Sequence, residues 1–504
     1  MSVRVNLDQL TDQQKKIIRE KLFFQPKKTN FSVNKFVSTE KDPVLFYWID
    51  KPNNQIVLPY TFANSLLGKH INSSLDYPPG KFNFTGKLRD NQIPVAETAL
   101  QQLRTSGTTT LSLPTGFGKS ILGAYLSCQC GGLALVLTPR ETIQTGWIKT
   151  YSSSTNAGIW VIDSKMKIPE QCNVILTMDG KFEKIPYQIR KMVSTLIIDE
   201  AHMFCTPTQV PVLLGTVPKY VIACSATLSR PDDMHRMITS IVGNHQIEVK
   251  NDKKFTVYKF LTGISTPLVK NKMGTTDFSK LTAALANDPI RNAFIVDLIE
   301  KNPQHKIMLL SWSKKHISLL YDILKKRGVS VDYLIGTKSS YVDSQVLLGS
   351  ISKVSTGFDS KNVAIDFDGV DISMLILVGS TKSYNLHIQS IGRCFRSESP
   401  VIIDFVDNNR ISKSHWNARR KHYQEMNCEI IDVVMHKRGQ DEQNNTDQEI
   451  DHTQMHNSRL KAYQHLKVEA PSSTINQLLN NKVVDKNVSM HVERLQAYRE
   501  KLKK

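Results

Sequence analysis

The residues whose types and spacing could do chemistry begin with LSLPTGFGKS, residues 111–120. A strand-like run leads into a turn containing Gly116 and Gly118, and a helical pattern opens at Lys119. Such a turn lets backbone N–H groups surround phosphates at the positive end of a helix dipole. We expect Lys119 to reach the β- and γ-phosphates and the Ser120 hydroxyl to bind Mg²⁺.

This turn departs from the general phosphate-binding pattern at its first glycine, where Leu113 stands. The alternative interpretation is an incidental glycine turn. A nucleotide site explains the pattern better, and Thr115 in the same turn belongs to it.

A second candidate is STLIIDEAH, residues 194–202, in which three apolar residues end in the paired carboxylates Asp199 and Glu200. Buried acids without compensation are unfavourable, so a metal or a base role accounts for them. Asp199 would hold Mg²⁺, and Glu200 would orient and deprotonate an attacking water. The alternative is an exposed strand end followed by a capped helix.

A third pattern points to other chemistry. Pro231-Asp232 followed by Glu248-Val249-Lys250 fits the loose carboxylate spacing of Mg²⁺-dependent nucleases. The pattern is permissive, and a nuclease is the minor alternative.

The elements that must position these residues alternate between strands and helices, which is typical of parallel α/β sheets. The first series has strands at 109–113, 133–137, 174–176, 195–198 and 220–223, with helices at 120–127 and 141–151. The second has helices at 290–300, 315–326 and 385–396, and strands at 307–312, 331–335, 346–351, 374–378 and 401–405. We therefore expect two α/β lobes.

The expected organisation has five parts. They are a small separate N-terminal module at 1–85, a first lobe at 86–250, a connecting segment at 251–287, a second lobe at 288–436 and a polar tail at 437–504. Within 43–68 the pattern predicts two short strands around a Pro-Asn-Asn turn, then a helix. The tail, helical or flexible, repeats a short Met-His-x-x-Arg-Leu-x-Ala-Tyr motif.

Composition narrows the function classes. The chain has 504 residues, a formal net charge of +19 and seven scattered cysteines without zinc spacing. The charge favours a polyanion partner, although codon bias explains it equally well. No apolar run is long enough for a membrane span, and the N-terminus lacks a secretory signal, so an intracellular protein is expected.

Three further motifs make the pattern specific. DEAH at 199–202, SAT at 225–227 and QSIGRCFR at 389–396 occur in that order, and the chain from 88 to 410 resembles superfamily 2 helicases. The resemblance implies two tandem RecA-like lobes, ATP and Mg²⁺ as cofactors, and DNA or RNA as the partner.

The resemblance also implies roles for single residues. Arg89 and Gln92 would recognise adenine. The nucleic-acid backbone would be contacted by Thr138, Pro139, Arg140 and Thr177. Hydrolysis would be coupled to lobe movement by His202, Ser225 and Thr227. The second lobe contributes Gly357 and Asp359 to ribose and nucleic-acid contacts, and Gln389, Arg393 and Arg396 to the final motif. Thr356 stands where the DEAD-box branch has arginine.

The two arginines have a physical argument of their own. A helix over 385–396 would place Arg393 and Arg396 on one face, at i and i+3. Two fixed guanidinium groups suit a triphosphate and would stabilise charge on the transferring phosphoryl. Taken alone, the same pattern favours a surface salt-bridge helix.

The branch can be narrowed by likeness. SATLSRPDDM at 225–234 and TPRETIQTGW at 138–147 are similar to repair helicases and poxvirus transcript-release proteins, and DFVDNNRISKSHWNARRKHY at 404–423 to helicases of large DNA viruses. This implies a role in viral transcription, a transcription-machinery partner, and the host cytoplasm or virion as location. Two alternatives stay open: an ATP-driven remodeller that separates no strands, and a binding module without catalysis.

Overall fold

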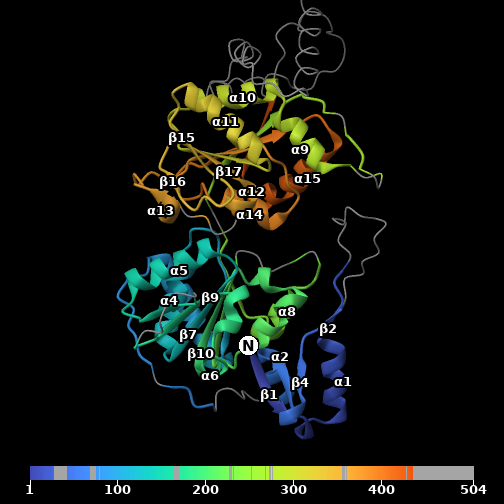
Figure 1. The fold of residues 1–504 in the computed structure, drawn as a ribbon, viewed down its shortest axis with the longest axis vertical. Coiled ribbons are helices and arrows are strands. Elements are labelled where there is room, and N and C mark those ends of the chain that lie inside the picture. Colours follow the sequence, from blue (N-terminus) through green and yellow to red (C-terminus); the bar gives the residue numbers. More distant parts are fainter. Residues whose placement is uncertain are drawn as a thin grey trace, which may run out of the picture. The chain divides into compact units, whose positions relative to one another are not determined.

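The chain folds into two compact units. The computed structural model describes residues 1–434 except 28–42, 69–74, 79, 163–169, 226–229, 231, 251–252, 267, 272–273, 275, 355–357, 359 and 427. One unit is Met1–Asn251 and the other begins at Asp252, and each contains a seven-stranded sheet (Figure 1). The tail expected at 437–504 lies outside the described residues.

The first sheet is parallel throughout, in the order β12-β6-β11-β10-β7-β9-β8. Its strands are β6 (Thr108–Ser112), β7 (Leu133–Thr138), β8 (Ile159–Val161), β9 (Val174–Met178), β10 (Val193–Asp199), β11 (Tyr220–Ser225) and β12 (Gln246–Glu248). The helices are α3 (Ile93–Ser106), α4 (Lys119–Cys130), α5 (Glu141–Ser154), α6 (Tyr187–Met192), α7 (Val210–Leu214) and α8 (Arg236–Val242).

Both faces of this sheet are covered. Along β7, Leu135 and Leu137 belong to one hydrophobic cluster, and Ala134 and Val136 belong to the other. Successive side chains of a strand point to opposite faces, so the apolar run of β7 is buried on both sides. Helices α3, α4 and α5 cover one face, while α7 and α8 cover the other.

The N-terminal residues are less separate than expected. They form β1 (Ser2–Asn6), α1 (Asp12–Lys21), β2 (Phe23–Phe24), β3 (Val44–Leu45), β4 (Trp48–Asp50), β5 (Gln55–Pro59) and α2 (Tyr60–Leu67). Their core shares one hydrophobic cluster with α7 and α8. The Tyr60 hydroxyl donates to the carbonyl of Lys219 at 2.9 Å, and the Thr61 hydroxyl to that of Ile241 at 2.6 Å. Because the antiparallel sheet β1-β5-β4 is too small to bury its own apolar face, it packs on the first lobe.

The second sheet is also parallel, in the order β15-β17-β14-β19-β20-β13-β21. Its strands are β13 (Thr256–Leu261), β14 (Ile307–Ser311), β15 (Val331–Leu334), β17 (Val346–Ser350), β19 (Met374–Leu377), β20 (Val401–Val406) and β21 (Glu429–Val434). A separate pair is β16 (Tyr341–Val342) with β18 (Ala364–Ile365).

Seven helices accompany this sheet in the described part of the second unit. They are α9 (Phe278–Ala286), α10 (Pro289–Glu300), α11 (Lys314–Lys326), α12 (Ile351–Val354), α13 (Ser360–Val363), α14 (Tyr384–Ile391) and α15 (Arg410–Glu425). Among the described residues, every helix is too short or too polar to span a bilayer.

The boundary of the second lobe also differs from the expected one. Strand β13, in the segment assigned to a connector at 251–287, pairs with β20 on one side and β21 on the other. Sequence periodicity shows that such a run is a strand but not which strands it pairs with. The second lobe therefore includes β13, and β21 was not foreseen.

A buried ion pair joins α15 to this sheet. Asp404 is fully buried on β20 and accepts two hydrogen bonds from Arg419, at 2.7 and 2.6 Å. The Tyr423 hydroxyl donates to the same carboxylate at 3.0 Å, and a further Arg419 N–H donates to the carbonyl of Thr381 at 3.0 Å. Because the charges satisfy each other, their burial is tolerated.

We predict that Arg419→Met lowers the free energy of unfolding of the second unit by about 3–5 kcal/mol, because it leaves Asp404 buried without its cation. Chemical denaturation measures this change. The matched control is Arg420→Met at the adjacent exposed position, expected to change stability by less than about 0.5 kcal/mol. Equal effects of the two substitutions would contradict the structural role of the pair.

Candidate nucleotide site

The chemistry-bearing residues of the first unit follow adjacent strands of one sheet edge. Strands β6, β11 and β10 are neighbours, and the register pairs Ser112 with Ser225 and Cys224 with Asp199. Because the strands are parallel, the chain leaves all three at their carboxyl ends, on the same edge. Ligands of open α/β sheets bind at this edge.

The turn between β6 and α4 has the backbone of a phosphate loop. Gly116 and Gly118 have φ of 83° and 99°, in the left-handed region that favours glycine. A Cβ at Gly118 would lie 2.4 Å from the Gln92 amide nitrogen. The Lys119 ammonium donates to the carbonyl of Leu113 at 3.1 Å. The turn is thus closed by its own lysine, and glycine is required at its last position.

Arg89 and Gln92 lie directly against this turn. The Arg89 guanidinium donates to the carbonyl of Gly116 at 3.2 Å and to that of Phe117, and the Gln92 amide donates to Phe117 at 2.6 Å. The Gln92 oxygen accepts from the Arg89 backbone N–H at 2.9 Å. The structure therefore brings these two residues to the phosphate loop, whereas adenine recognition stays a prediction.

Asp199 ends β10 as a buried carboxylate with two donors. The indole N–H of Trp147 donates to one oxygen at 2.7 Å, and the Glu200 backbone N–H to the other at 2.9 Å. Burial, with the Glu200 charge adding to it, raises the pKa of Asp199 to about 6, while Lys119 acts in the opposite direction. Two donors thus hold the carboxylate in place, and binding of Mg²⁺ by Asp199 stays a prediction.

Trp147 is the site residue that sequence reasoning missed. Its position marks a family likeness, but no role follows from the sequence. The indole is fully buried and passes over α4 at Gly123, where a Cβ would lie 2.5 Å from the ring. A glycine inside a helix, opposite an aromatic on the next helix, is the signal that could have indicated this contact.

Glu200 combines a strained backbone with a buried carboxylate oxygen. It lies at φ 50° and ψ 49°, a left-handed conformation that is strained for a residue with a side chain. Within the described residues, its Oε2 is buried without a hydrogen-bond partner and lies 3.5 Å from the His202 Nδ1. A buried carboxylate oxygen of this kind needs a water or a cation. These acceptors therefore fit Mg²⁺ and an attacking water.

His202 connects this carboxylate to β11. Its Nδ1 forms a hydrogen bond of 2.9 Å with the Ser225 hydroxyl. Burial above all, and then the Arg230 charge, lowers the pKa of His202 to about 4, so the ring is neutral near pH 7. Arg230 also donates to the His202 carbonyl at 2.7 Å. Thr227, the third residue of the predicted coupling set, lies outside the described residues.

One of the carboxylates that a nuclease would need for Mg²⁺ is already bound by an arginine. Asp232 is engaged by the Arg230 guanidinium through two hydrogen bonds, at 2.9 and 2.7 Å. Glu248 lies exposed on β12, and the described residues contain no group of three metal-ligating side chains. Asp232 therefore serves to fix Arg230 under His202.

The predicted nucleic-acid contacts follow β7 and β9. Thr138 and Thr177 are buried at the ends of these neighbouring strands, and the Thr138 hydroxyl donates to the Thr177 carbonyl at 3.4 Å. Pro139 is half-buried, and Arg140 caps α5 through its backbone. The structure brings the four residues together, and their contact with nucleic acid stays a prediction.

The predicted helix over 385–396 is wrong at its end. Helix α14 stops at Ile391 and Gly392 caps it; the Arg393 N–H then bonds the Ser390 carbonyl at 3.2 Å in a tighter turn. Glycine is a poor helix former, so the helix ends before Arg393 and Arg396. These two arginines therefore lie on turns beyond the helix and not at i and i+3 of one helical face.

The final motif nonetheless has defined neighbours in the second unit. Gln389 is buried on α14. Arg393 donates to the carbonyl of Phe358 at 2.5 Å, and the Arg396 guanidinium lies 3.9 Å from Asp371. Gly357 and Asp359 lie outside the described residues.

Comparisons with known proteins agree with this geometry. Residues 85–230 match the family model described as Type III restriction enzyme, res subunit. The match includes the phosphate loop and the Asp199–His202 segment and ends before Asp232 and Glu248.

Three similar proteins come from viruses. The chain is 28% identical to "Putative helicase 161L" of Invertebrate iridescent virus 6, over 74% of this chain and 88% of that protein. It is 26% identical to "Putative ATP-dependent RNA helicase L396" of Acanthamoeba polyphaga mimivirus, over 84% of each. It is 23% identical to "Transcript termination protein A18" of Yaba-like disease virus, over 57% of this chain and 64% of that protein.

The order of the motifs, the two parallel sheets and these matches lead to one conclusion. The chain is an ATP-dependent nucleic-acid helicase or translocase of superfamily 2.

Proposed function

We propose that the chain hydrolyses ATP·Mg²⁺ at the carboxyl edge of the first sheet and uses the energy to release transcripts during viral transcription. One observation supports the proposal above the others: the glycine turn, the paired acids and the His202–Ser225 bond lie on three adjacent strand ends. The Yaba-like disease virus relative is named a transcript termination protein, and this favours a task at the end of transcription.

The residues around the turn have distinct tasks in this proposal. Gly116 and Gly118 expose backbone N–H groups to the phosphates, and Lys119 leaves the Leu113 carbonyl to bind them. Ser120 and Asp199 hold Mg²⁺, which neutralises charge on the phosphate oxygens when bound. Arg89 and Gln92 recognise adenine, and Thr115 completes the loop.

Hydrolysis requires a base, and Glu200 is that base. A water oxygen attacks the γ-phosphorus, the bond from that phosphorus to the β–γ bridging oxygen breaks, and the water proton passes to the Glu200 carboxylate. The products are ADP and phosphate. Arg393 and Arg396 stabilise charge on the transferring phosphoryl, with Gln389 assisting. His202, Ser225 and Thr227 couple the step to lobe movement.

The nucleic acid is DNA or RNA, held through its backbone by Thr138, Pro139, Arg140 and Thr177 of the first lobe and by Gly357 and Asp359 of the second. Backbone contacts carry little sequence information, so weak sequence preference is expected. A stalled transcription complex with labelled RNA tests the proposed task. Release of the RNA with ATP, without displacement of a strand from a plain duplex, supports a remodeller; displacement without release supports an unwinding helicase instead.

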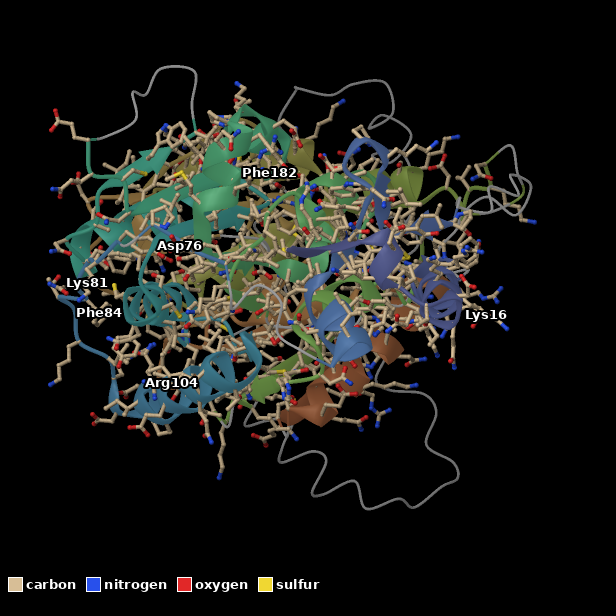
Figure 2. The ribbon with its side chains drawn as sticks, turned by 90° about the horizontal axis from the view of Figure 1, so that it is seen from below. Lys16, Asp76, Lys81, Phe84, Arg104 and Phe182 are labelled. Atoms are coloured by element: carbon tan, nitrogen blue, oxygen red, sulfur yellow. The ribbon has the colours of Figure 1, made fainter. Side chains whose placement is uncertain are left out.

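We predict that Glu200→Gln lowers nucleic-acid-stimulated ATP hydrolysis by about 10²- to 10⁴-fold, because the amide accepts no proton. Lys119→Ala is expected to abolish it, because the phosphates lose their cation. Phosphate release measures both, and fluorescence anisotropy checks that nucleic-acid binding largely survives. Lys16→Ala, on an exposed side of α1 (Figure 2), serves as the control. Undiminished turnover in either site variant would refute the assignment.

We also predict that Trp147→Phe raises the Mg²⁺ concentration needed for half-maximal nucleotide binding by about 10- to 100-fold. The reason is that Asp199 loses a donor that orients it. Titration of Mg²⁺ against a fluorescent nucleotide measures the effect without turnover. The matched control is Trp160→Phe, a buried indole on β8. If both variants keep the Mg²⁺ dependence of the parent and differ from it only in unfolding temperature, the positioning role is wrong.

A further inference from the structure

One face of α15 carries four exposed cations. Arg410, Lys413, Arg420 and Lys421 are exposed, whereas Trp416, Arg419, Tyr423 and Ser412 form the buried face of the same helix. At 3.6 residues per turn, the four cations fall within an arc of about 100°. They form one stripe, which we call the α15 stripe.

The α15 stripe has no acidic residue within its span of the sequence. Residues 408–424 contain no Asp or Glu. Within the part of the chain that the structure describes, none of the four cations forms an ion pair, whereas Lys15 on α1 lies 3.7 Å from Asp12. Buried Arg419 is neutralised by Asp404 and adds little to the field. The exposed charge is therefore available to an external anion.

The position of two of these cations is unfavourable for the helix itself. Arg410 and Lys413 lie in the first turn, at the positive end of the helix dipole, where cations destabilise a helix. Asn409 caps this end, its side chain accepting from the Ser412 N–H at 2.8 Å. Fold stability alone therefore does not account for cations at this end, and an anionic partner would compensate both the dipole and the charges.

The dimensions of the stripe fit a row of phosphates. From Arg410 to Lys421 the helix rises about 16 Å, at 1.5 Å per residue. One strand of a duplex advances about 3.4 Å per phosphate along its axis, so the stripe spans several phosphates. The remaining exposed side chains of α15 are Asn417, Gln424 and, at its last residue, Glu425, and none of them is aromatic. Such a face suits the backbone of a nucleic acid and not its bases.

The surroundings extend the positive field. Helix α15 begins just after β20, at the carboxyl edge of the second sheet. Lys382 follows β19 at the same edge. The pKa of His415 on α15 is lowered mainly by burial, then by the charge of Arg419 and then by that of Lys382. Helix α9 lies beside α15, where the rings of Phe278 and His415 are 5.8 Å apart (Figure 1).

We infer that the α15 stripe is a second-unit contact for the phosphate backbone of the nucleic acid, apart from the motif residues already assigned. The inference rests on the proposed function, since it assumes that the chain acts on a nucleic acid. An acidic protein is the competing occupant. The four cations share one face of the helix without an apolar anchor between them, and this favours a polyanion over a protein surface.

The test compares two full-length variants that each lose three positive charges. One is Lys413→Gln/Arg420→Gln/Lys421→Gln on α15. The control is Lys16→Gln/Arg19→Gln/Lys21→Gln on α1, whose exposed cations are interspersed with Asp12 and Glu20. Anisotropy with labelled 30-nucleotide single-stranded DNA, single-stranded RNA and the corresponding duplexes, from low to moderate salt, gives Kd and its salt dependence.

The α15 variant is expected to bind about 10- to 100-fold more weakly near 0.1 M salt. The slope of log K against log salt should fall by roughly 0.7 to 0.9 for each phosphate that is no longer neutralised. The α1 control should retain the parent slope, because the cations of α1 are interspersed with acids and do not form a stripe of one sign. ATP hydrolysis without nucleic acid and the unfolding temperature should be unchanged in both variants, which shows that the site and fold are intact.

Two results overturn the inference. Equal losses of affinity in both variants would mean that net charge and not the α15 stripe is responsible. If the α15 variant keeps the salt dependence of the parent, the α15 stripe does not contact the nucleic acid, and an acidic protein becomes its expected partner. Failure of the proposed function looks different: the parent chain itself would bind none of the four probes.

Discussion

A buried carboxylate sets the conditions for the rest of the first unit. Asp199 ends a strand that is buried along its whole length, and a charge at that depth requires hydrogen-bond donors. The indole of Trp147 supplies one donor, and that indole reaches Asp199 only because Gly123 has no side chain. The second donor is the Glu200 N–H, and Glu200 adopts a strained backbone conformation. The orientation of Asp199 thus depends on Trp147 and Gly123, which are far from it in sequence, as well as on its neighbour Glu200.

The parallel topology explains why these demands can be met together. Strands β6, β11 and β10 are distant in sequence but adjacent in the sheet, and each delivers its last residue to the same edge. The hydrogen bond between His202 and Ser225 then connects the segment after β10 to the end of β11. This buried hydrogen bond of 2.9 Å holds both side chains in place.

Much of this fold could be predicted from periodicity and motif spacing. The strands expected at 109–113 and 220–223 lie within two residues of β6 and β11, because buried apolar runs bounded by turns are clear signals. The pairing of β13 could not be predicted, since a run of alternating residues does not reveal its neighbours. The end of α14 was misjudged because the arginines continued a helical spacing that Gly392 interrupts.

The site was predictable where a motif names its residues and unpredictable where tertiary contacts decide. The glycines of the phosphate loop and the paired acids follow from local sequence, because a turn and a strand end are local structures. The Trp147 contact depends on how α5 crosses α4, which no spacing within either helix states. The strain at Glu200 is likewise a product of the assembled sheet edge.

The arginines of the second unit show why net charge alone could not decide between a polyanion partner and codon bias. Arg291 bonds the buried Asp407 at 2.9 Å, and Arg419 bonds Asp404, so both cations are cancelled inside the fold. Only cations that are exposed and not paired can release counterions from a nucleic acid. A codon bias would raise the number of cations without placing them on particular faces of a helix. On α15, by contrast, the buried Arg419 is neutralised, and four exposed cations share the outer face. The distribution of the charge, and not its sum, is therefore the physical argument for a polyanion.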